Sequence, residues 1–221
     1  MAKMINLHHT YQKLLNYYGS RNWWPAETPF EVVIGAILTQ NTNWRNVEKA
    51  IANLRQADAL TLEAILNLEL ATLEQLIRPS GFFRQKAERL QLFCRYLQEH
   101  HQGSLEHLFD QELNLVRNEL LSQKGIGPET ADSILLYAGQ RPSFVVDAYT
   151  CRLFRRLGVL SGKENYTDVR DLFMSHLPQD IQLYNEYHAL IVIHCKEFCR
   201  KKPLCNNCPV AEICLYAQQN C

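Results

Sequence analysis

The sequence predicts an all-α fold made of many short helices. Apolar residues recur at helical spacing in one segment after another, and glycine or proline interrupts the pattern at short intervals. No stretch shows the strict apolar and polar alternation that is typical of a strand, and we find no internal repeat or low-complexity linker. At 221 residues, the chain is long enough for a good core in one domain or in two small ones.

Composition narrows the class of protein. No apolar run approaches the length of a membrane span, and the N-terminus lacks the apolar core of a secretory signal, so we expect a cytoplasmic location. The net charge is zero, which argues against a large non-specific surface for nucleic acid. Basic residues nevertheless gather at 152–156 and at 196–202, and such local patches suffice for a ligand that is gripped at one place.

The first half of the chain predicts a series of helices. Residues 7–18 are amphipathic and should form a helix that ends at Gly19. Residues 30–39 are apolar nearly all round, which predicts a buried helix, and Asn43 fits the N-cap of the helix that follows. Shorter helices are expected at 61–67 and 71–78, and a longer one at 85–101.

Aromatic side chains stand at two places where they do not fit a helical core face. Trp23 and Trp24 are adjacent and precede a proline, and Phe82 and Phe83 follow a glycine on a predicted turn. A hydrophobic plug explains the tryptophan pair, and packing into the core explains the phenylalanine pair. The alternatives are that at least one tryptophan ring faces something other than the helix core, and that the phenylalanines push between bases.

A glycine hairpin joins two predicted helices near residue 125. The helical pattern breaks at Gly125-Ile126-Gly127, and Pro128 with Glu129 suits the start of a new helix. Two glycines can expose their amides beside the free N–H groups of a helix start, and such a place binds phosphate. An ordinary corner between two helices with a capping glycine is the alternative.

Asp147 follows the hairpin by twenty residues. It stands between the apolar run 144–146 and a segment that predicts a helix, roughly from residue 148. Asp147 therefore fits an N-cap, and most acids at such positions do nothing more than cap.

Four of the eight cysteines lie close together near the C-terminus: Cys199, Cys205, Cys208 and Cys214. Nothing indicates secretion, so a metal cofactor explains these thiols better than disulfides do. Zinc is the simplest alternative. Structural zinc sites usually use two separated C-x2-C pairs, however, whereas here a single pair is flanked by single cysteines.

The hairpin, the downstream acid and the cysteine cluster together resemble the endonuclease III superfamily of DNA glycosylases, over nearly the whole chain. The resemblance implies a two-domain helix-hairpin-helix architecture, with a six-helix domain at 29–138 and a second domain made of 1–28 and 139–221. It implies that a monomer binds double-stranded DNA with a damaged base across the cleft between them. It also implies that Asp147 is the catalytic carboxylate.

In many members of this superfamily the C-terminal cysteines hold a [4Fe–4S] cluster, so the resemblance implies that cofactor. The family has six residues between its first two cysteines, and this chain has five. The other two gaps match, as does the Lys-Pro pair before Cys205. Cys195 is the alternative first ligand if the short gap cannot close.

Within the superfamily, the chain is similar to the 3-methyladenine DNA glycosylases. The segments that carry this resemblance are Trp23-Trp24-Pro25, 38–42, 78–82, 124–127 and 145–147. It implies a base pocket of Trp23, Trp24 and Trp44. It implies that Gln40 fills the gap in the duplex and that Phe82 is the wedge. Phosphate contacts are expected from Lys124, Gly125 and Gly127.

The resemblance also bears on the reaction. Bifunctional members carry a lysine where this chain has Glu129, and a carboxylate cannot form an imine, so we expect a monofunctional enzyme that leaves an abasic site. A cationic alkylated purine leaves easily and needs aromatic faces and one carboxylate more than it needs general acids. A glycosylase or AP lyase for oxidised or mismatched bases, and a catalytically silent DNA-binding homologue, remain alternatives.

Overall fold

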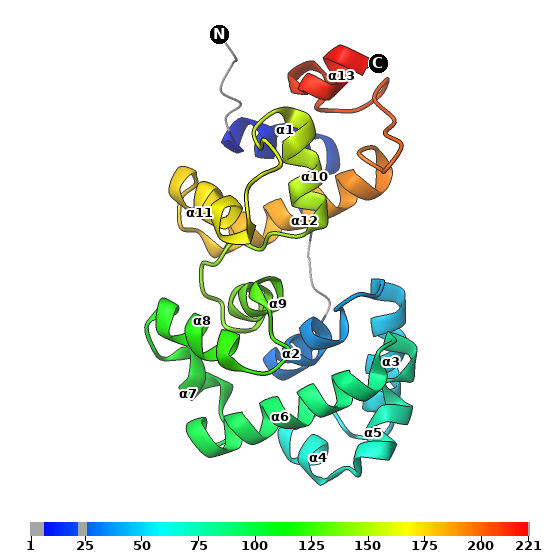
Figure 1. The fold of residues 1–221 in the computed structure, drawn as a ribbon, viewed down its shortest axis with the longest axis vertical. Helices are drawn as coiled ribbons and strands as arrows, with labels where there is room; N and C mark the ends of the chain where they lie inside the picture. The colour runs from blue at the N-terminus through cyan, green and yellow to red at the C-terminus, as the bar shows by residue number, and fades with distance from the viewer. Residues whose placement is uncertain (1–6, 22–25, 221) are drawn as a thin grey trace. The chain divides into compact units, whose positions relative to one another are not determined.

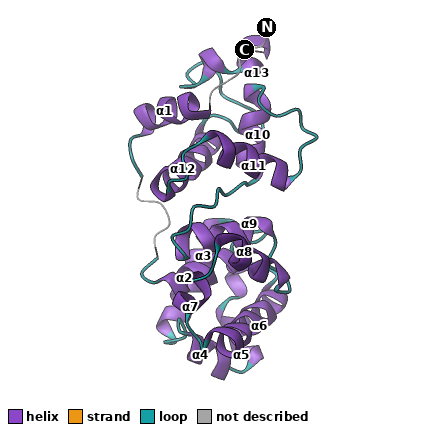
Figure 2. Cartoon of the chain, turned by 90° about the vertical axis from the view of Figure 1, so that its left-hand side faces the viewer, coloured by secondary structure: helices purple, strands orange, loops and turns teal. Residues whose placement is uncertain are grey.

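The computed structural model of the chain describes residues 7–21 and 26–220. Every regular element among them is helical and none is a strand, which confirms the predicted all-α fold (Figures 1 and 2). Trp23 and Trp24, expected in the base pocket, lie outside the described residues. Within the described ranges, no helix has the length and apolar character needed to cross a membrane.

The chain divides into two compact units, residues 24–141 and residues 1–23 with 142–221. The domains implied by the resemblance, with their boundaries at residues 29 and 138, remain a prediction, because a compact unit is not by itself a domain that folds alone.

The continuous unit is built around α2 (Pro29–Leu38), which is buried nearly all round as its sequence predicts. The Thr28 side chain caps this helix by accepting a hydrogen bond from the Glu31 amide at 3.1 Å. The longest helix of the unit, α6 (Phe83–His101), packs against α2 and against the short helices on either side of it in sequence (Figure 1). The other helices of this unit are α3 (Trp44–Gln56), α4 (Leu62–Asn67), α5 (Leu70–Leu76), α7 (Leu105–Phe109), α8 (Leu113–Ser122) and α9 (Pro128–Ser133), with a 3₁₀ turn at Arg78–Ser80 and a π-helical stretch at Ile134–Ala138.

The discontinuous unit joins the N-terminal helix to the C-terminal part of the chain. Its helices are α1 (Leu7–Tyr18), α10 (Ala148–Leu157), α11 (Tyr166–His176), α12 (Ile181–Glu197) and α13 (Leu215–Asn220), with a 3₁₀ turn at Ala211–Ile213. Helix α1 packs on α12, and the buried Tyr187 hydroxyl donates to the Leu7 carbonyl at 2.7 Å. An aromatic core holds the unit together, with Phe144 stacked on Phe173 at 4.1 Å between ring centroids.

Local signals in the sequence place most helix ends correctly. Helix α1 ends before Gly19, and Asn43 caps α3 by accepting from the Asn46 amide at 3.1 Å, as predicted. One expectation was wrong: Phe83 is not on the turn but is the first residue of α6. Phe82 takes the left-handed φ of +47°, so the turn is complete one residue earlier than the pattern indicates.

Candidate functional site

Asp147 is the N-cap of α10, as predicted. Its Oδ1 accepts hydrogen bonds from the Thr150 amide at 2.7 Å and from the Thr150 hydroxyl at 3.0 Å. Its Oδ2 lies 3.5 Å from Nε2 of His188, a residue of α12 that sequence reasoning did not single out. No local signal could have found His188, because the two residues meet only when α10 packs on α12.

These contacts fix the charge of Asp147. Burial opposes ionisation of its carboxyl, but the hydrogen bonds from Thr150 and the nearby His188 ring outweigh burial and hold the pKa below its ordinary value. The side chain is 12% exposed, so solvent or a ligand still reaches it. Asp147 is therefore an ionised carboxylate at neutral pH in a mostly dry environment.

The glycine hairpin has the geometry that its sequence predicts. Gly125 has a φ of +85°, which glycine alone adopts at little cost, and Ile126 between the two glycines is buried. Gly127 is the N-cap of α9, and Pro128 is its first residue. A methyl group added at Gly127 would meet no atom within 4 Å, so the backbone there faces open space.

Gln40 is held against the hairpin. Its Nε2 donates to the Gly125 carbonyl at 2.8 Å and to the Thr130 hydroxyl at 2.9 Å, and its Oε1 accepts from Nη1 of Arg89 at 2.6 Å. The structure thus brings a predicted gap-filling residue and a predicted phosphate-binding glycine together within the unit 24–141. Arg89 is a further residue of this cluster that sequence reasoning missed.

Two aromatic residues expected to contact the base or the duplex are described. Phe82 is 61% exposed, which is unusual for a large apolar ring. Trp44, in the first turn of α3, lines a pocket of about 180 Å³ together with Glu31, Glu48 and Arg55. Glu31 is buried and pairs with Arg55 at 2.9 Å.

The four C-terminal cysteines lie on one compact loop between α12 and α13. A turn closed by the hydrogen bond from the Cys208 amide to the Cys205 carbonyl brings two of them together. Nη1 of Arg156 donates to Sγ of Cys199 at 3.2 Å. Arg156 also donates to the carbonyls of Arg200 and Lys201, so it holds the loop in place.

The surroundings distinguish Cys199 from its neighbour Cys195. A hydrogen bond from Cys195 and the Arg156 guanidinium lower the pKa of the Cys199 thiol to about 6, whereas the same bond and burial raise the pKa of Cys195. Cys199 is the better thiolate of the two. Its place on the loop also favours it as the first ligand.

A buried polar chain reaches the loop from α1. The Tyr18 hydroxyl lies 3.2 Å from Nδ1 of His194, and Nε2 of His194 lies 3.6 Å from Sγ of Cys208. Burial lowers the pKa of His194 to about 4, so the ring is neutral and carries one N–H. If Cys208 is a thiolate it can only accept, and the proton then sits on Nε2 while Nδ1 accepts from Tyr18.

The donor set of the loop fits a [4Fe–4S] cluster by its chemistry. Four thiols on one loop, with an arginine N–H directed at Cys199 and a His194 ring nitrogen 3.6 Å from Cys208, suit an anionic cluster. Across residues 7–21 and 26–220, no group of side chains converges as the ligands of a single metal ion do. In a [4Fe–4S] cluster each thiolate binds a different iron, so convergence on one point is not required.

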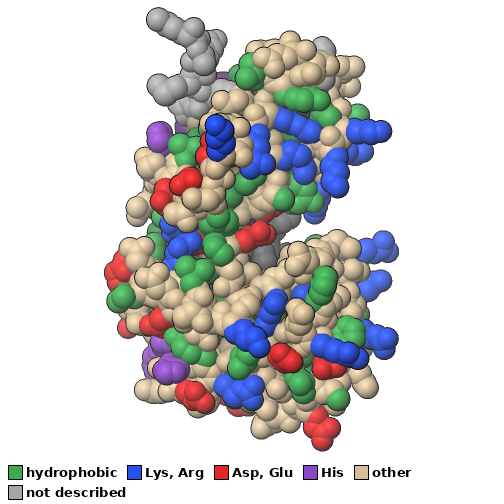
Figure 3. Space-filling view, in the orientation of Figure 1, with side chains coloured by type: hydrophobic (Ala, Val, Ile, Leu, Met, Phe, Trp, Pro, Cys, Tyr) green, Lys and Arg blue, Asp and Glu red, His purple; other side chains and the backbone are tan. Residues whose placement is uncertain are grey.

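Basic side chains gather beside this loop, from α10 and from the loop itself (Figure 3). Nε of Arg152 donates to the Cys199 carbonyl at 2.8 Å, and its guanidinium lies over the Tyr149 ring at 4.9 Å. The two basic clusters of the sequence thus meet within one unit, which makes a local positive surface in a chain of zero net charge.

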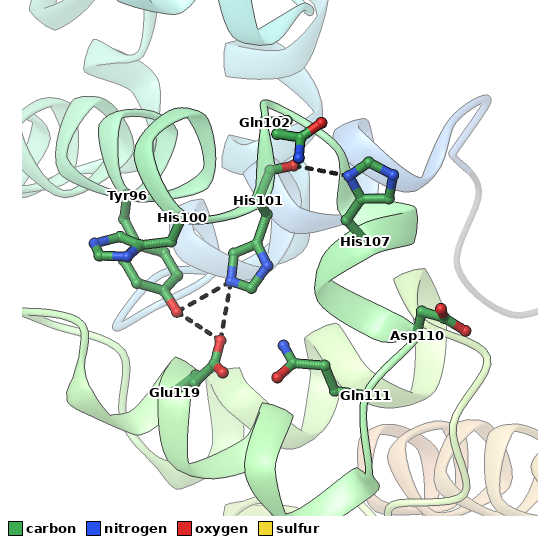
Figure 4. Close-up of a pocket in the computed structure, with 8 residues that line it drawn as sticks. All are labelled: Tyr96, His100, His101, Gln102, His107, Asp110, Gln111 and Glu119. Carbon is green, nitrogen blue, oxygen red and sulfur yellow. Dashed lines mark hydrogen bonds and ion pairs between the residues drawn. The ribbon is translucent and has the colours of Figure 1, made fainter.

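A polar pocket of about 560 Å³ lies between the C-terminal end of α6 and helices α7 and α8 (Figure 4). Tyr96 donates to Oε2 of Glu119 at 2.6 Å, and Nε2 of His101 lies 2.9 Å from the same oxygen. Burial opposes the charge of Glu119, but these bonds outweigh it and lower its pKa. The part of the pocket that α6 lines is roughly 20 to 30 Å from Phe82 by the rise of an α-helix.

The fold and the hairpin define the class of the protein. The chain belongs to the family described as the HhH-GPD superfamily of base excision DNA repair proteins, which matches residues 34–179. It is a DNA glycosylase of that superfamily, and its ligand is DNA.

Individual relatives agree with this assignment. The chain is 54% identical, over 96% of its length and 97% of the relative, to the protein of Methanocaldococcus jannaschii named "Putative DNA repair glycosylase MJ1434". It is 30% identical to endonuclease III of Haemophilus influenzae, over 87% of this chain and 86% of that one.

Solved structures show the same fold. The 3-methyladenine DNA glycosylase MagIII of H. pylori, bound to 1,N6-ethenoadenine, matches with a TM-score of 0.76 and 31% identity, over 87% of this chain and 98% of that chain. A non-covalent endonuclease III–DNA complex matches with a TM-score of 0.84 at 22% identity, over 99% of this chain and 98% of that chain, a likeness that shows the fold alone.

Proposed function

We propose that this glycosylase is monofunctional and removes alkylated purines such as 3-methyladenine from duplex DNA. The observation that carries the proposal is the state of Asp147. A carboxylate held below its ordinary pKa by His188 and Thr150 can stabilise a positive sugar, but it has no proton to give to a leaving base. It therefore suits substrates whose bases leave without protonation, and purines alkylated at N3 or N7 are already cationic.

The reaction in this proposal is hydrolysis of one bond. The bond between C1′ of the sugar and N9 of the purine breaks, and its electron pair leaves with the base, which becomes neutral. Asp147 stabilises the positive charge that develops on the sugar, and water adds to C1′ after losing a proton to the carboxylate or to solvent. The product is an abasic site in an intact strand.

Glu129 supports the absence of lyase activity. It is an exposed residue in the first turn of α9, at the position where the resemblance places a lysine in bifunctional enzymes. A carboxylate cannot form the imine that leads to strand cleavage. Lys124 is exposed just before the hairpin and is assigned to phosphate.

The other residues take the roles that the resemblance implies. Trp44 forms the base pocket with Trp23 and Trp24, and an aromatic face near the acids Glu31 and Glu48 suits a cationic base. The likeness to MagIII supports this substrate class, because that protein is a 3-methyladenine glycosylase. Gln40 fills the gap, Phe82 is the wedge, and Lys124, Gly125 and Gly127 bind phosphate.

A [4Fe–4S] cluster on Cys199, Cys205, Cys208 and Cys214 completes the proposal. When bound, the cluster would supply a structural cross-link between α12 and the basic loop, and it takes no part in the hydrolysis. The Arg156 contact to Cys199 supports Cys199 over Cys195 as the first ligand.

The proposal is tested with duplexes that each contain one defined lesion. We expect base release from duplexes with 3-methyladenine, 7-methylguanine or ethenoadenine, and strand breaks only after alkali. Duplexes with oxidised pyrimidines, 8-oxoguanine or a G·T mismatch should stay intact. Release of an oxidised or mismatched base with spontaneous strand cleavage would favour the lyase alternative, and no release from any duplex would favour the silent homologue.

A further inference from the structure

Lys86 is a buried lysine with an unusual pair of partners. It lies in the first turn of α6 and is 1% exposed, and Nζ donates to the Leu38 carbonyl at 2.8 Å and to the Ser80 carbonyl at 2.7 Å. Among the described residues, no carboxylate pairs with it. Burying an ammonium group on two neutral carbonyls is costly, and removing it would leave those two buried carbonyls without this donor.

The two carbonyls belong to the segments that carry two residues expected to enter the duplex. Leu38 is the last residue of α2, two residues before Gln40. Ser80 ends the 3₁₀ turn, two residues before Phe82. A single ammonium group therefore fixes the distance between the base of the predicted gap-filling segment and the base of the predicted wedge.

Arg89, one turn further along α6, extends the same connection to the hairpin. Its guanidinium holds Oε1 of Gln40 at 2.6 Å, while Nε2 of Gln40 bonds the Gly125 carbonyl and the Thr130 hydroxyl. A methyl group added at Gly125 would collide with the Arg89 side chain, so this packing is close. One face of α6 thus joins the wedge, the gap-filling segment and the hairpin.

The wedge itself needs support. Phe82 is exposed and has a positive φ directly after Gly81, which also has a positive φ. Such a conformation persists only when its surroundings hold it. The 3₁₀ turn before Phe82 packs on α3, and the Lys86 amide donates to the Phe82 carbonyl at 3.1 Å. The bond from Nζ of Lys86 to the Ser80 carbonyl adds a side-chain tie between this turn and the end of α2.

We propose that Lys86 is a positioning residue for base extrusion, whose ammonium ties the Gln40 segment to the Phe82 turn so that both side chains enter the duplex as one rigid unit. This inference rests on the roles proposed above for Gln40 and Phe82. It does not depend on which base is excised.

The test compares Lys86→Met with wild type on the same lesion in two settings. In a fully paired duplex, the base must be extruded before it is excised. In a single strand it is already accessible. We expect single-turnover excision from the duplex to fall by on the order of 10²-fold, because a misplaced wedge misaligns the extruded base. Excision from the single strand should change less than about threefold, because no wedge is needed there.

A second readout does not require chemistry. A 2-aminopurine placed beside an uncleavable abasic analogue brightens when the enzyme unstacks the duplex. We expect wild type to raise this fluorescence and Lys86→Met to fail to do so at saturating protein. This arm separates the two proposals: if wild type excises no alkylated purine but the fluorescence difference remains, the proposed substrate is wrong and the role of Lys86 stands.

Controls guard against a general loss of structure. Leu97→Ala removes a fully buried side chain from the same helix without touching either segment, and it should slow both settings equally if at all. If Lys86→Met does not fold, Lys86→Gln replaces it, because a shorter neutral side chain cannot reach both carbonyls as the lysine does. If the rate of excision falls by the same factor in duplex and in single strand, or falls in neither, the inference is wrong.

Discussion

The replacement Asp147→Asn separates the two roles of this residue. As a cap, Asn keeps the oxygen that accepts from the Thr150 amide at 2.7 Å, and Asn and Asp cap about equally well. We therefore expect a stability change of at most about 0.5 kcal/mol from the cap, which corresponds to roughly 2 °C or less in Tm for a chain of this size. The fold and the C-terminal loop should be unaffected.

As a catalytic group, Asp147 loses the charge that would face the developing sugar cation. Removing one such preorganised interaction costs on the order of 10²-fold in rate, or about 2.7 kcal/mol of transition-state stabilisation. The expected loss in rate is thus several times larger, in free energy, than the loss in stability. A cap alone cannot produce that difference.

The assay is single-turnover excision of 3-methyladenine from a duplex, with affinity measured separately on the same duplex. Asp180→Asn is the matched control, because Asp180 caps α12 through the Leu183 amide at 2.9 Å but lies on the exposed surface. We expect Asp147→Asn to bind at least as tightly as wild type and to excise about a hundredfold more slowly. If Asp147→Asn excises the base as fast as Asp180→Asn does, Asp147 is only a helix cap and not a catalytic residue.

The pH dependence of stability gives a second check. The pKa of Asp147 is lowered in the folded state, so its contribution is present above the ordinary pKa of an aspartate, about 3.9, and is lost as the pH falls through the lower folded value. The free energy of unfolding of wild type minus that of Asp147→Asn should therefore shrink as the pH falls below about pH 4. A difference that stays the same down to about pH 2 would contradict a lowered pKa for Asp147.

Three further outcomes are expected. The purified protein should be brown and contain about four irons per chain. Cys205→Ser should lower the stability of the protein before it lowers the rate of excision. Stoichiometric zinc after anaerobic purification would contradict the iron–sulfur assignment. Gly127→Ala should fold normally, since its methyl group meets no atom within 4 Å, and should weaken binding to damaged and undamaged duplexes by similar factors in titrations; a loss on damaged DNA alone would refute that role. Borohydride should trap no covalent protein–DNA adduct. An adduct that forms with wild type but not with Lys124→Ala would show that Lys124 acts as the lyase nucleophile.

Much of the fold follows from local chemistry that the sequence displays. Asn43 and Asp147 are caps because a short polar side chain precedes a helical pattern, and Gly125 turns because glycine alone tolerates its φ. The helix α7 was not anticipated, since five residues are too few to show a period. Local signals thus locate elements and their ends.

The surroundings of the site could not be predicted in the same way. Nothing in the local sequence distinguishes His188, which contacts Asp147, from other residues of its helix. The same holds for Lys86, which bonds the Ser80 carbonyl next to the predicted wedge. Their partners come from other parts of the chain, and for Lys86 they are backbone carbonyls, which every residue offers. Such contacts are visible only once the helices are packed.

Because the discontinuous unit is made of segments on both sides of residues 24–141, its parts are synthesised at different times. Residues 24–141 are continuous, so that unit has all its parts as soon as its last residue leaves the ribosome. Helix α1 emerges before that unit, yet α12, the helix that packs on it, is made only after the unit is complete. Leu14, which is fully buried in the finished protein, must therefore wait exposed while most of the chain is translated. The nascent N-terminal helix is the segment for which a chaperone would have the longest time to bind.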